Sequence, residues 1–252
     1  MQNAQALQWQ RSWDLQQESF RPDREECFTA LLDVAEAVGG DAPRVLDLAC
    51  GTGSITQRLL HRMPDASSLG VDFDPVMLAI AEGTFAGDHR ARFVRADLMS
   101  PDWRDGIEGP FDAVLSATAL HWLPEQRLRA LYGEVRELLV DGGVFSNSDH
   151  MVDPALPDLT PRLEKVRERK QDEVYRSGRA MTWSAWWEAA RAAPELADAV
   201  AERDRAIGNT GGDHGDSLPQ LPAHLDALRH AGFAEVGLVW RGLTDAAFAA
   251  VR

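Results

Sequence analysis

The sequence predicts an α/β fold: a doubly wound, mostly parallel sheet of seven strands with an antiparallel C-terminal hairpin, accompanied by helical cap segments. Between residues 44 and 151, short apolar runs alternate with helical patterns, which is typical of parallel strands joined by crossover helices. The last two apolar runs are separated only by residues 241–245, too few for a crossover, so they must pair as a hairpin. The 252 residues suffice for one such domain.

Seven short apolar runs are the expected strands, and four longer amphipathic stretches are the helices between them. In chain order, the strands are Arg44–Leu48, Ser68–Asp72, Arg92–Ala96, Asp112–Ser116, Gly143–Asn147, Glu235–Trp240 and Ala246–Val251. The helices are Ser54–Met63, Pro75–Gly83, Glu125–Leu139 and Ala223–Ala231. Since the first five strands alternate with helices, their carboxyl ends should meet at one edge of the sheet.

Two helical segments lie outside this alternation. Residues 1–40 read as two helices, the second opened by Pro22 and Asp23, and residues 154–217 read as a helical insertion with breaks near Gly178 and Pro194. A glycine-rich stretch, 208–216, is expected to be a mobile loop. We expect a single domain in which both segments cap the carboxyl edge, residues 41–153 form the α/β core, and residues 218–252 add the final helix and hairpin.

Composition limits the partners. The chain has 40 acidic and 26 basic residues, and its net charge of −14 opposes the phosphate neutralisation that nucleic acids and anionic membranes require. Two cysteines without a CxxC or Cys/His cluster argue against disulfides and zinc. The N-terminus resembles no signal peptide, and no apolar run approaches a membrane span. We expect a soluble cytoplasmic protein, monomeric or homodimeric, without nucleic-acid or membrane partners.

An acid followed by a glycine-rich turn ends the first strand. Gly51 and Gly53 allow the backbone to approach a ligand at the carboxyl edge, where open α/β sheets bind cofactors. Asp47 precedes this turn, in a place where a carboxylate repels a pyrophosphate and attracts a cationic amino group. Asp72 ends the second strand and is suited to accept both hydroxyls of a ribose, while Asp97 follows the third and is suited to an exocyclic amino group.

These residues resemble the motifs of the class I S-adenosylmethionine-dependent methyltransferases over residues 44–151 and 221–252. The matching stretches are Asp47-Leu-Ala-Cys-Gly-Thr-Gly, Gly70-Val-Asp-Phe-Asp-Pro, Arg95-Ala-Asp-Leu, Phe111-Asp-Ala-Val-Leu-Ser and Leu138-Leu-Val-Asp-Gly-Gly-Val-Phe. The resemblance implies S-adenosylmethionine as cofactor and S-adenosylhomocysteine as product. It assigns cofactor binding to Asp47, Ala49, Gly51, Gly53, Asp72, Phe73, Asp97, Leu98 and Ser116. Ala49 stands where the family often has glycine.

The resemblance also implies the chemistry, a direct displacement in which the protein aligns the reactants and excludes water. A base is needed only for an acceptor that is protonated at working pH. Our first candidate for this role is His121 and our second is His150; packing under the cap is the alternative. Acceptor contacts are expected from Trp9, Trp13, His121, Trp122, Asp149 and Trp186. Aromatic residues suit a flat apolar acceptor, although amphipathic cap helices bury tryptophans as well. No metal is expected, because the fourth strand ends without a carboxylate.

Four other functions were weighed. A dinucleotide-dependent oxidoreductase fits poorly, because Thr56 occupies the place of the third fingerprint glycine and neither Asp47 nor Asp97 has a role. A nucleic-acid methyltransferase is disfavoured by charge and by the lack of an Asn/Asp-Pro-Pro-Tyr motif. A non-methylating reaction with the same cofactor, or a catalytically silent cofactor-binding subunit, stays open. We predict methyl transfer to a small molecule.

Overall fold

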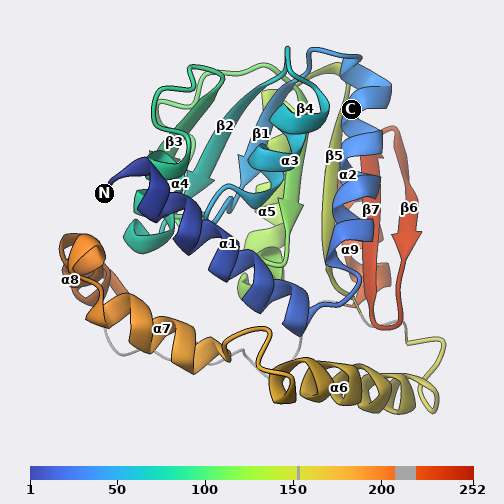
Figure 1. Cartoon of the computed structure of the whole chain (residues 1–252). Coiled ribbons are helices and arrows are strands. Elements are labelled where there is room, and N and C mark those ends of the chain that lie inside the picture. Colours follow the sequence, from blue (N-terminus) through green and yellow to red (C-terminus); the bar gives the residue numbers. More distant parts are fainter. Residues whose placement is uncertain (152–153, 208–219) are drawn as a thin grey trace.

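The computed structural model describes residues 1–151, 154–207 and 220–252. It contains a seven-stranded sheet in the order β3-β2-β1-β4-β5-β7-β6 (Figure 1). The strands are β1 Arg44–Leu48, β2 Ser67–Asp72, β3 Ala91–Arg95, β4 Phe111–Ala117, β5 Leu139–His150, β6 Glu235–Arg241 and β7 Asp245–Val251. Strands β1 to β5 pair in parallel, whereas β7 pairs antiparallel with both β5 and β6. The predicted fold class and its terminal hairpin are confirmed.

Helices cover both faces of the sheet. In chain order they are α1 Asn3–Phe20, α2 Arg24–Gly39, α3 Ser54–Arg62, α4 Pro75–Thr84, η1 Leu120–Trp122, α5 Glu125–Leu138, α6 Thr160–Arg176, α7 Trp183–Ala192, η2 Pro194–Leu196, α8 Ala197–Ile207 and α9 Leu221–His230. Alternate strand residues divide the core between the two faces: Phe145 packs with α5 and α9, while its neighbour Val144 packs with α2 and α3. Both expected N-terminal helices are present.

Strand β5 is longer than expected, and this changes the position of two site candidates. We placed Asp149 and His150 after the strand, but both lie within it. The reason is the antiparallel partner: β7 pairs with β5 without interruption from Val144 to His150, so the polar end of the strand keeps its ladder of hydrogen bonds. Successive strand residues point to opposite faces, which separates these two side chains.

The N-terminal helix and the insertion lie at the carboxyl edge of the parallel strands. Figure 1 shows α1 running obliquely across this edge, with α6, α7 and α8 beyond it. Trp186 and Trp187 of α7 pack with Val76 and Ile80 of α4, and Trp9 and Trp13 of α1 complete this cluster. Helix α6 has no buried residue. The expected loop 208–216 falls outside the described residues, and the division of the chain into core and caps stays a prediction.

Candidate cofactor and acceptor site

The turn after β1 has a backbone that most side chains avoid. Ala49, Gly51 and Gly53 all have positive φ angles, of 56°, 55° and 80°. A Cβ added at Gly53 would lie 2.9 Å from the ring of Phe85, so glycine is also required there by packing. At Gly51 an added Cβ would lie more than 4 Å from every atom of the described residues, which leaves the backbone of the turn accessible to a ligand.

Asp47 lies just below this turn and is 1 % exposed. Its Oδ2 accepts hydrogen bonds from the backbone N and the Oγ1 of Thr56, at 3.1 and 2.7 Å, and thereby anchors the first turn of α3. Its Oδ1 has no hydrogen-bond partner within the described residues. Burial raises the pKa of Asp47 to about 7. An unpaired buried carboxylate oxygen is costly, and a cationic group would satisfy it.

Asp72 joins the end of β2 to the glycine turn. Its Oδ2 accepts from the backbone N of Gly51 at 2.8 Å and its Oδ1 from that of Asp74 at 2.9 Å. Burial raises the pKa of Asp72 to about 6. Repulsion from the carboxylate of Asp72 adds to the rise in the pKa of Asp47. The structure therefore brings two of the three expected acids together around Gly51.

The other expected cofactor residues line the same edge in different environments. Asp97 is exposed just beyond β3, and its Oδ1 accepts from the backbone N of Met99 at 2.9 Å. Phe73 is 43 % exposed beside Asp72, whereas Leu98 is buried. Ser116 is fully buried, and its Oγ donates to the carbonyl of Leu48 at 2.8 Å, so it supports the strand from which the turn departs.

On the other side of the edge, two imidazole–carboxylate pairs flank the end of β5. Asp149 Oδ1 lies 2.7 Å from Nδ1 of His121, and its Oδ2 accepts from the backbone N of His121 at 3.1 Å. On the opposite face, Nδ1 of His150 lies 3.3 Å from Asp245 Oδ1, and the buried Arg21 donates its Nε–H to Asp245 Oδ2 at the same distance. The consecutive residues Asp149 and His150 thus belong to separate pairs.

Comparison with known proteins decides the family. Residues 45–143 match the model of a methyltransferase domain. The chain is 35 % identical over 117 residues to a trans-aconitate 2-methyltransferase of Streptomyces avermitilis, covering 45 % of this chain and 42 % of the relative. It is 36 % identical over 129 residues to a release factor glutamine methyltransferase of Rhodospirillum rubrum, covering 49 % and 37 %. The chain thus spans less than half the length of these two relatives.

Residues 45–143 thus form a methyltransferase domain of the class I S-adenosylmethionine-dependent family. The solved structures agree at the level of the fold. An O-methyltransferase family protein from Burkholderia thailandensis superposes with a TM-score of 0.60 at 20 % identity, over 92 % of this chain and 57 % of that one. The resemblance of the motifs around Asp47, Asp72 and Asp97 to this family is confirmed.

The residues at this edge fit S-adenosylmethionine on two structural grounds. Asp47 presents a buried carboxylate oxygen that has no hydrogen-bond partner in the part of the chain that the structure describes, which suits the ammonium group of S-adenosylmethionine. The backbone at Gly51 is open, next to the carboxylate of Asp72. Thr56, the residue that departs from a dinucleotide fingerprint, bonds Asp47 instead. The assignment of individual residues to the cofactor stays a prediction.

Two residues at this edge were missed by the sequence analysis. On α1, Nε2 of the fully buried Gln10 donates to the carbonyl of Thr52 at 3.2 Å, and Asp14 Oδ1 accepts from Ser54 Oγ at 2.6 Å. Both partners lie on the glycine turn or at the start of α3. Arg24 and Arg58 also bond Asp14. The sequence did contain a signal. Gln10 and Asp14 are polar residues four positions apart in an amphipathic helix, and this spacing places them on one face of the helix.

Three of the tryptophans expected at the acceptor, Trp9, Trp13 and Trp186, pack α1 against α7. Trp186 is fully buried, donates its Nε1–H to Ser12 Oγ at 2.9 Å and packs edge-on against Trp13 with ring centroids 4.8 Å apart. Trp9 donates to Glu195 Oε1 at 3.0 Å. In contrast, Trp122 is 49 % exposed, and its ring centroid lies 5.3 Å from that of His121. Acceptor contact by these residues stays a prediction.

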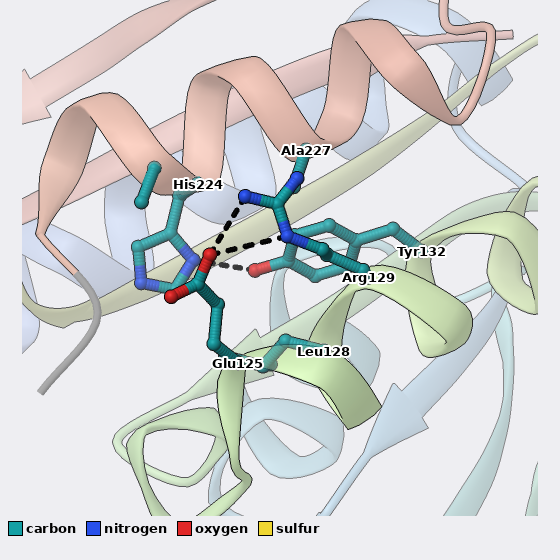
Figure 2. Close-up of a pocket in the computed structure, with 7 residues that line it drawn as sticks. Glu125, Leu128, Arg129, Tyr132, His224 and Ala227 are labelled. Carbon is teal, nitrogen blue, oxygen red and sulfur yellow. Dashed lines mark hydrogen bonds and ion pairs between the residues drawn. The ribbon is translucent and has the colours of Figure 1, made fainter.

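A small hollow lies between the first turns of α5 and helix α9 (Figure 2). Tyr132 and His224 bond each other there, with the phenol oxygen 2.5 Å from Nδ1, and an ion pair between Glu125 and Arg129 borders it. Its volume of about 10 Å³ corresponds to a single water molecule, so it cannot hold an acceptor. Among the described residues, no group of three His, Cys, Asp or Glu side chains is arranged to hold a metal ion, and no helix is long and apolar enough to cross a membrane.

Proposed function

We propose that this protein transfers the methyl group of S-adenosylmethionine to a small molecule by direct displacement. One observation supports a small acceptor. Helix α1 crosses the edge where the cofactor residues lie, and Gln10 and Asp14 bond this helix to the glycine turn and the start of α3. A protein side chain or a nucleic acid would need an open approach to this edge. The names of the two relatives include both a small acid and a protein acceptor.

When bound, the cofactor supplies an electrophilic methyl group on a positively charged sulfur. The residues around the turn have the complementary task of holding it: Asp47 faces the amino group, Asp72 the ribose, and Asp97 with Phe73 and Leu98 the adenine. Ala49, Gly51, Gly53 and Ser116 shape the turn that approaches it. Helix α1 excludes water from the reacting atoms, which aids a displacement between aligned partners.

Two measurements test the proposal. Calorimetry with S-adenosylhomocysteine should show binding, and Asp72→Ala should weaken it about 100-fold, since losing two hydrogen bonds to a charged acceptor costs about 3 kcal/mol. Asp105→Ala, an exposed acid outside the site, is the matched control. Equal affinity in both variants would contradict the site assignment.

The reaction is tested by incubating the protein with methyl-labelled cofactor and a library of small molecules, in parallel with release factor peptides. We expect label in a small molecule. Label only in the peptides would refute a small acceptor. Cofactor consumption without label in any product would indicate a non-methylating reaction, and binding without consumption would indicate a silent subunit.

A further inference from the structure

The loop after β3 holds Asp97 and Leu98 in a tight turn. The carbonyl of Asp97 accepts from the backbone N of Ser100 at 2.9 Å, and its Oδ1 accepts from the backbone N of Met99 at the same distance. These are the bonds of a β-turn and of an Asx-turn. Within the described part of the chain, Oδ2 of Asp97 and the backbone N–H of Leu98 have no hydrogen-bond partner. The turn therefore offers an acceptor and a donor on consecutive residues.

This combination of groups is complementary to adenine. The 6-amino group of the base donates and its N1 accepts, so one edge of the base can bond both Asp97 Oδ2 and the N–H of Leu98. The strand order agrees with this placement. Asp47, Asp72 and Asp97 lie on or just after β1, β2 and β3, which are neighbours in the sheet. The amino group, the ribose and the base of the cofactor would then follow one another along the edge.

A guanidinium on α5 binds the backbone of the same turn. Nε of Arg127 donates to the carbonyl of Leu98 at 2.5 Å, and its Nη2 donates to that of Ser100 at 3.3 Å. Because a peptide unit is planar, holding the carbonyl of Leu98 also holds the plane of the peptide that joins it to Met99. Arg127 therefore restrains the conformation of the turn through its carbonyl groups.

Glu134 and Trp103 hold Arg127 in place. Glu134 lies two turns further along α5 and accepts from Nη1 and Nη2 of Arg127 at 2.9 and 2.6 Å, and this two-point pair fixes the plane of the guanidinium. Its Oε2 also accepts from Nε1 of Trp103 at 2.6 Å, and the Trp103 ring is buried in the core. Burial acts to raise the pKa of Glu134, but Arg127 and Trp103 outweigh this effect and keep the pKa below its usual range.

From this arrangement we propose that Arg127 is a positioning residue for cofactor recognition. It holds the turn 97–100 in the conformation in which Asp97 and Leu98 select adenine over other bases. The inference rests on the proposed function and adds to it the origin of the base selectivity. A purely stabilising role differs in its consequence, because loss of stability would change the affinity for every base alike.

Hypoxanthine is the base that separates these two roles. It has an oxygen in place of the 6-amino group and a hydrogen on N1. In the same position, its oxygen would face the carboxylate of Asp97, and its N1–H would face the N–H of Leu98. Both contacts would bring like groups together and leave them without hydrogen bonds, so a well-ordered turn should reject this base.

Base selectivity tests the proposal without turnover. Calorimetry should show that the wild type binds S-adenosylhomocysteine about 100-fold or more tightly than S-inosylhomocysteine. Arg127→Met, which keeps an apolar stem but no donor, should weaken S-adenosylhomocysteine about tenfold and S-inosylhomocysteine less than about twofold. The affinity ratio should therefore fall at least about fivefold. Arg129→Met, an exposed change on the same helix that also removes an ion pair, should leave this ratio unchanged.

The amide of Leu98 gives a second measurement. Its hydrogen exchange, followed by nuclear magnetic resonance, should be slowed by saturating S-adenosylhomocysteine in the wild type and much less in Arg127→Met. Arg127→Lys supplies the same comparison should the methionine variant not fold. Lysine can bind a carbonyl but cannot form the two-point pair with Glu134, so its ratio should lie between those of the wild type and of Arg127→Met.

Two results would overturn the inference. One is an affinity ratio that neither Arg127 variant changes, and the other is a wild type that binds both ligands equally. Either result would leave binding of S-adenosylhomocysteine, and with it the proposed function, intact. A wild type that binds neither ligand would instead refute the proposed function.

Discussion

At the scale of single residues, strain and charge concentrate on the turn after β1. Ala49 adopts a φ of 56°, a left-handed conformation that costs an L-residue with a Cβ about 1–2 kcal/mol. The cost implies that the turn is held in place by its surroundings, among them the bond from Gly51 to Asp72.

The effect of a substitution at Ala49 on stability should therefore depend on how easily the new residue adopts a positive φ, and not on its size alone. Ala49→Gly relieves the strain but adds freedom to the unfolded chain, so the free energy of unfolding should be unchanged or rise by up to about 1 kcal/mol. Ala49→Val, with a β-branched side chain, should lower it by about 2 kcal/mol or more. Denaturant titration measures both. If the free energy of unfolding of the wild type exceeded that of Ala49→Gly by more than about 1 kcal/mol, the backbone at Ala49 would not be strained.

The raised pKa values of Asp47 and Asp72 make both stability and cofactor binding depend on pH. A carboxyl group whose pKa is higher in the folded protein stabilises the fold at pH values below its unfolded pKa, and this contribution is lost as the pH rises through the folded value. For these two residues the window extends from about pH 4 to about pH 7. Without cofactor, the free energy of unfolding should thus fall across this window.

A cationic cofactor reverses this effect, because it favours the ionised form of Asp47. Binding of S-adenosylmethionine at pH 6.5 should release protons, and the calorimetric binding enthalpy should vary with the ionisation enthalpy of the buffer. Asp47→Asn should remove most of this dependence and weaken binding. The exposed change Asp105→Ala should alter neither. A wild-type enthalpy that is the same in every buffer would show that Asp47 is already ionised.

At the scale of elements, buried side chains of α1 bond this helix to the glycine turn and to the start of α3. Gln57 also donates to Gln10 Oε1, at 2.9 Å, so the amide of Gln10 is fixed at both ends. Burial acts to raise the pKa of Asp14, but Arg24 and Arg58 hold it below its usual range. The position of α1 over the sheet edge and the conformation of the glycine turn therefore depend on the same contacts.

Loss of the Gln10 contacts should loosen both parts together. Gln10→Ala removes about 1 kcal/mol of hydrogen bonding, and the affinity for S-adenosylhomocysteine should fall about fivefold. Amide hydrogen exchange should become faster along α1 and in the glycine turn. Arg11→Ala, an exposed change on the same helix, serves as the reference. Faster exchange in α1 with unaltered affinity would separate the helix from the cofactor site.

The sequence was informative where local rules apply and less so where distant segments meet. Apolar runs and the glycine turn predicted the strands and the edge at which Asp47 and Asp72 lie, because both signals are local. The length of β5 was set by β7, about a hundred residues away in sequence, and was underestimated. The pairing of His121 with Asp149 likewise depends on the register of β4 and β5, which spacing alone does not reveal.

At the scale of the whole molecule, the insertion is tied to the ribose end of the cofactor edge. Arg203 of α8 donates to Asp74 Oδ2 at 2.7 Å, and its guanidinium lies 4.0 Å above the ring of Trp187. Asp74 also begins α4 by accepting from the backbone N of Val76 at 2.9 Å. Since Asp72 accepts from the backbone N of Asp74, one chain of contacts connects α8 to the glycine turn.

This chain of contacts predicts that cofactor binding and docking of α8 reinforce each other. Arg203→Ala removes an ion pair and a cation–π contact, so α8 should become more sensitive to limited proteolysis, and the affinity for S-adenosylhomocysteine should fall severalfold. Arg205→Ala, an exposed change two positions along α8, should do neither. Saturating S-adenosylhomocysteine should slow proteolysis of α8 more in the wild type than in the variant. Only the wild type has the Arg203 contact that connects α8, through Asp74, to Asp72. Equal protection in the two proteins would mean that the insertion folds independently of the site.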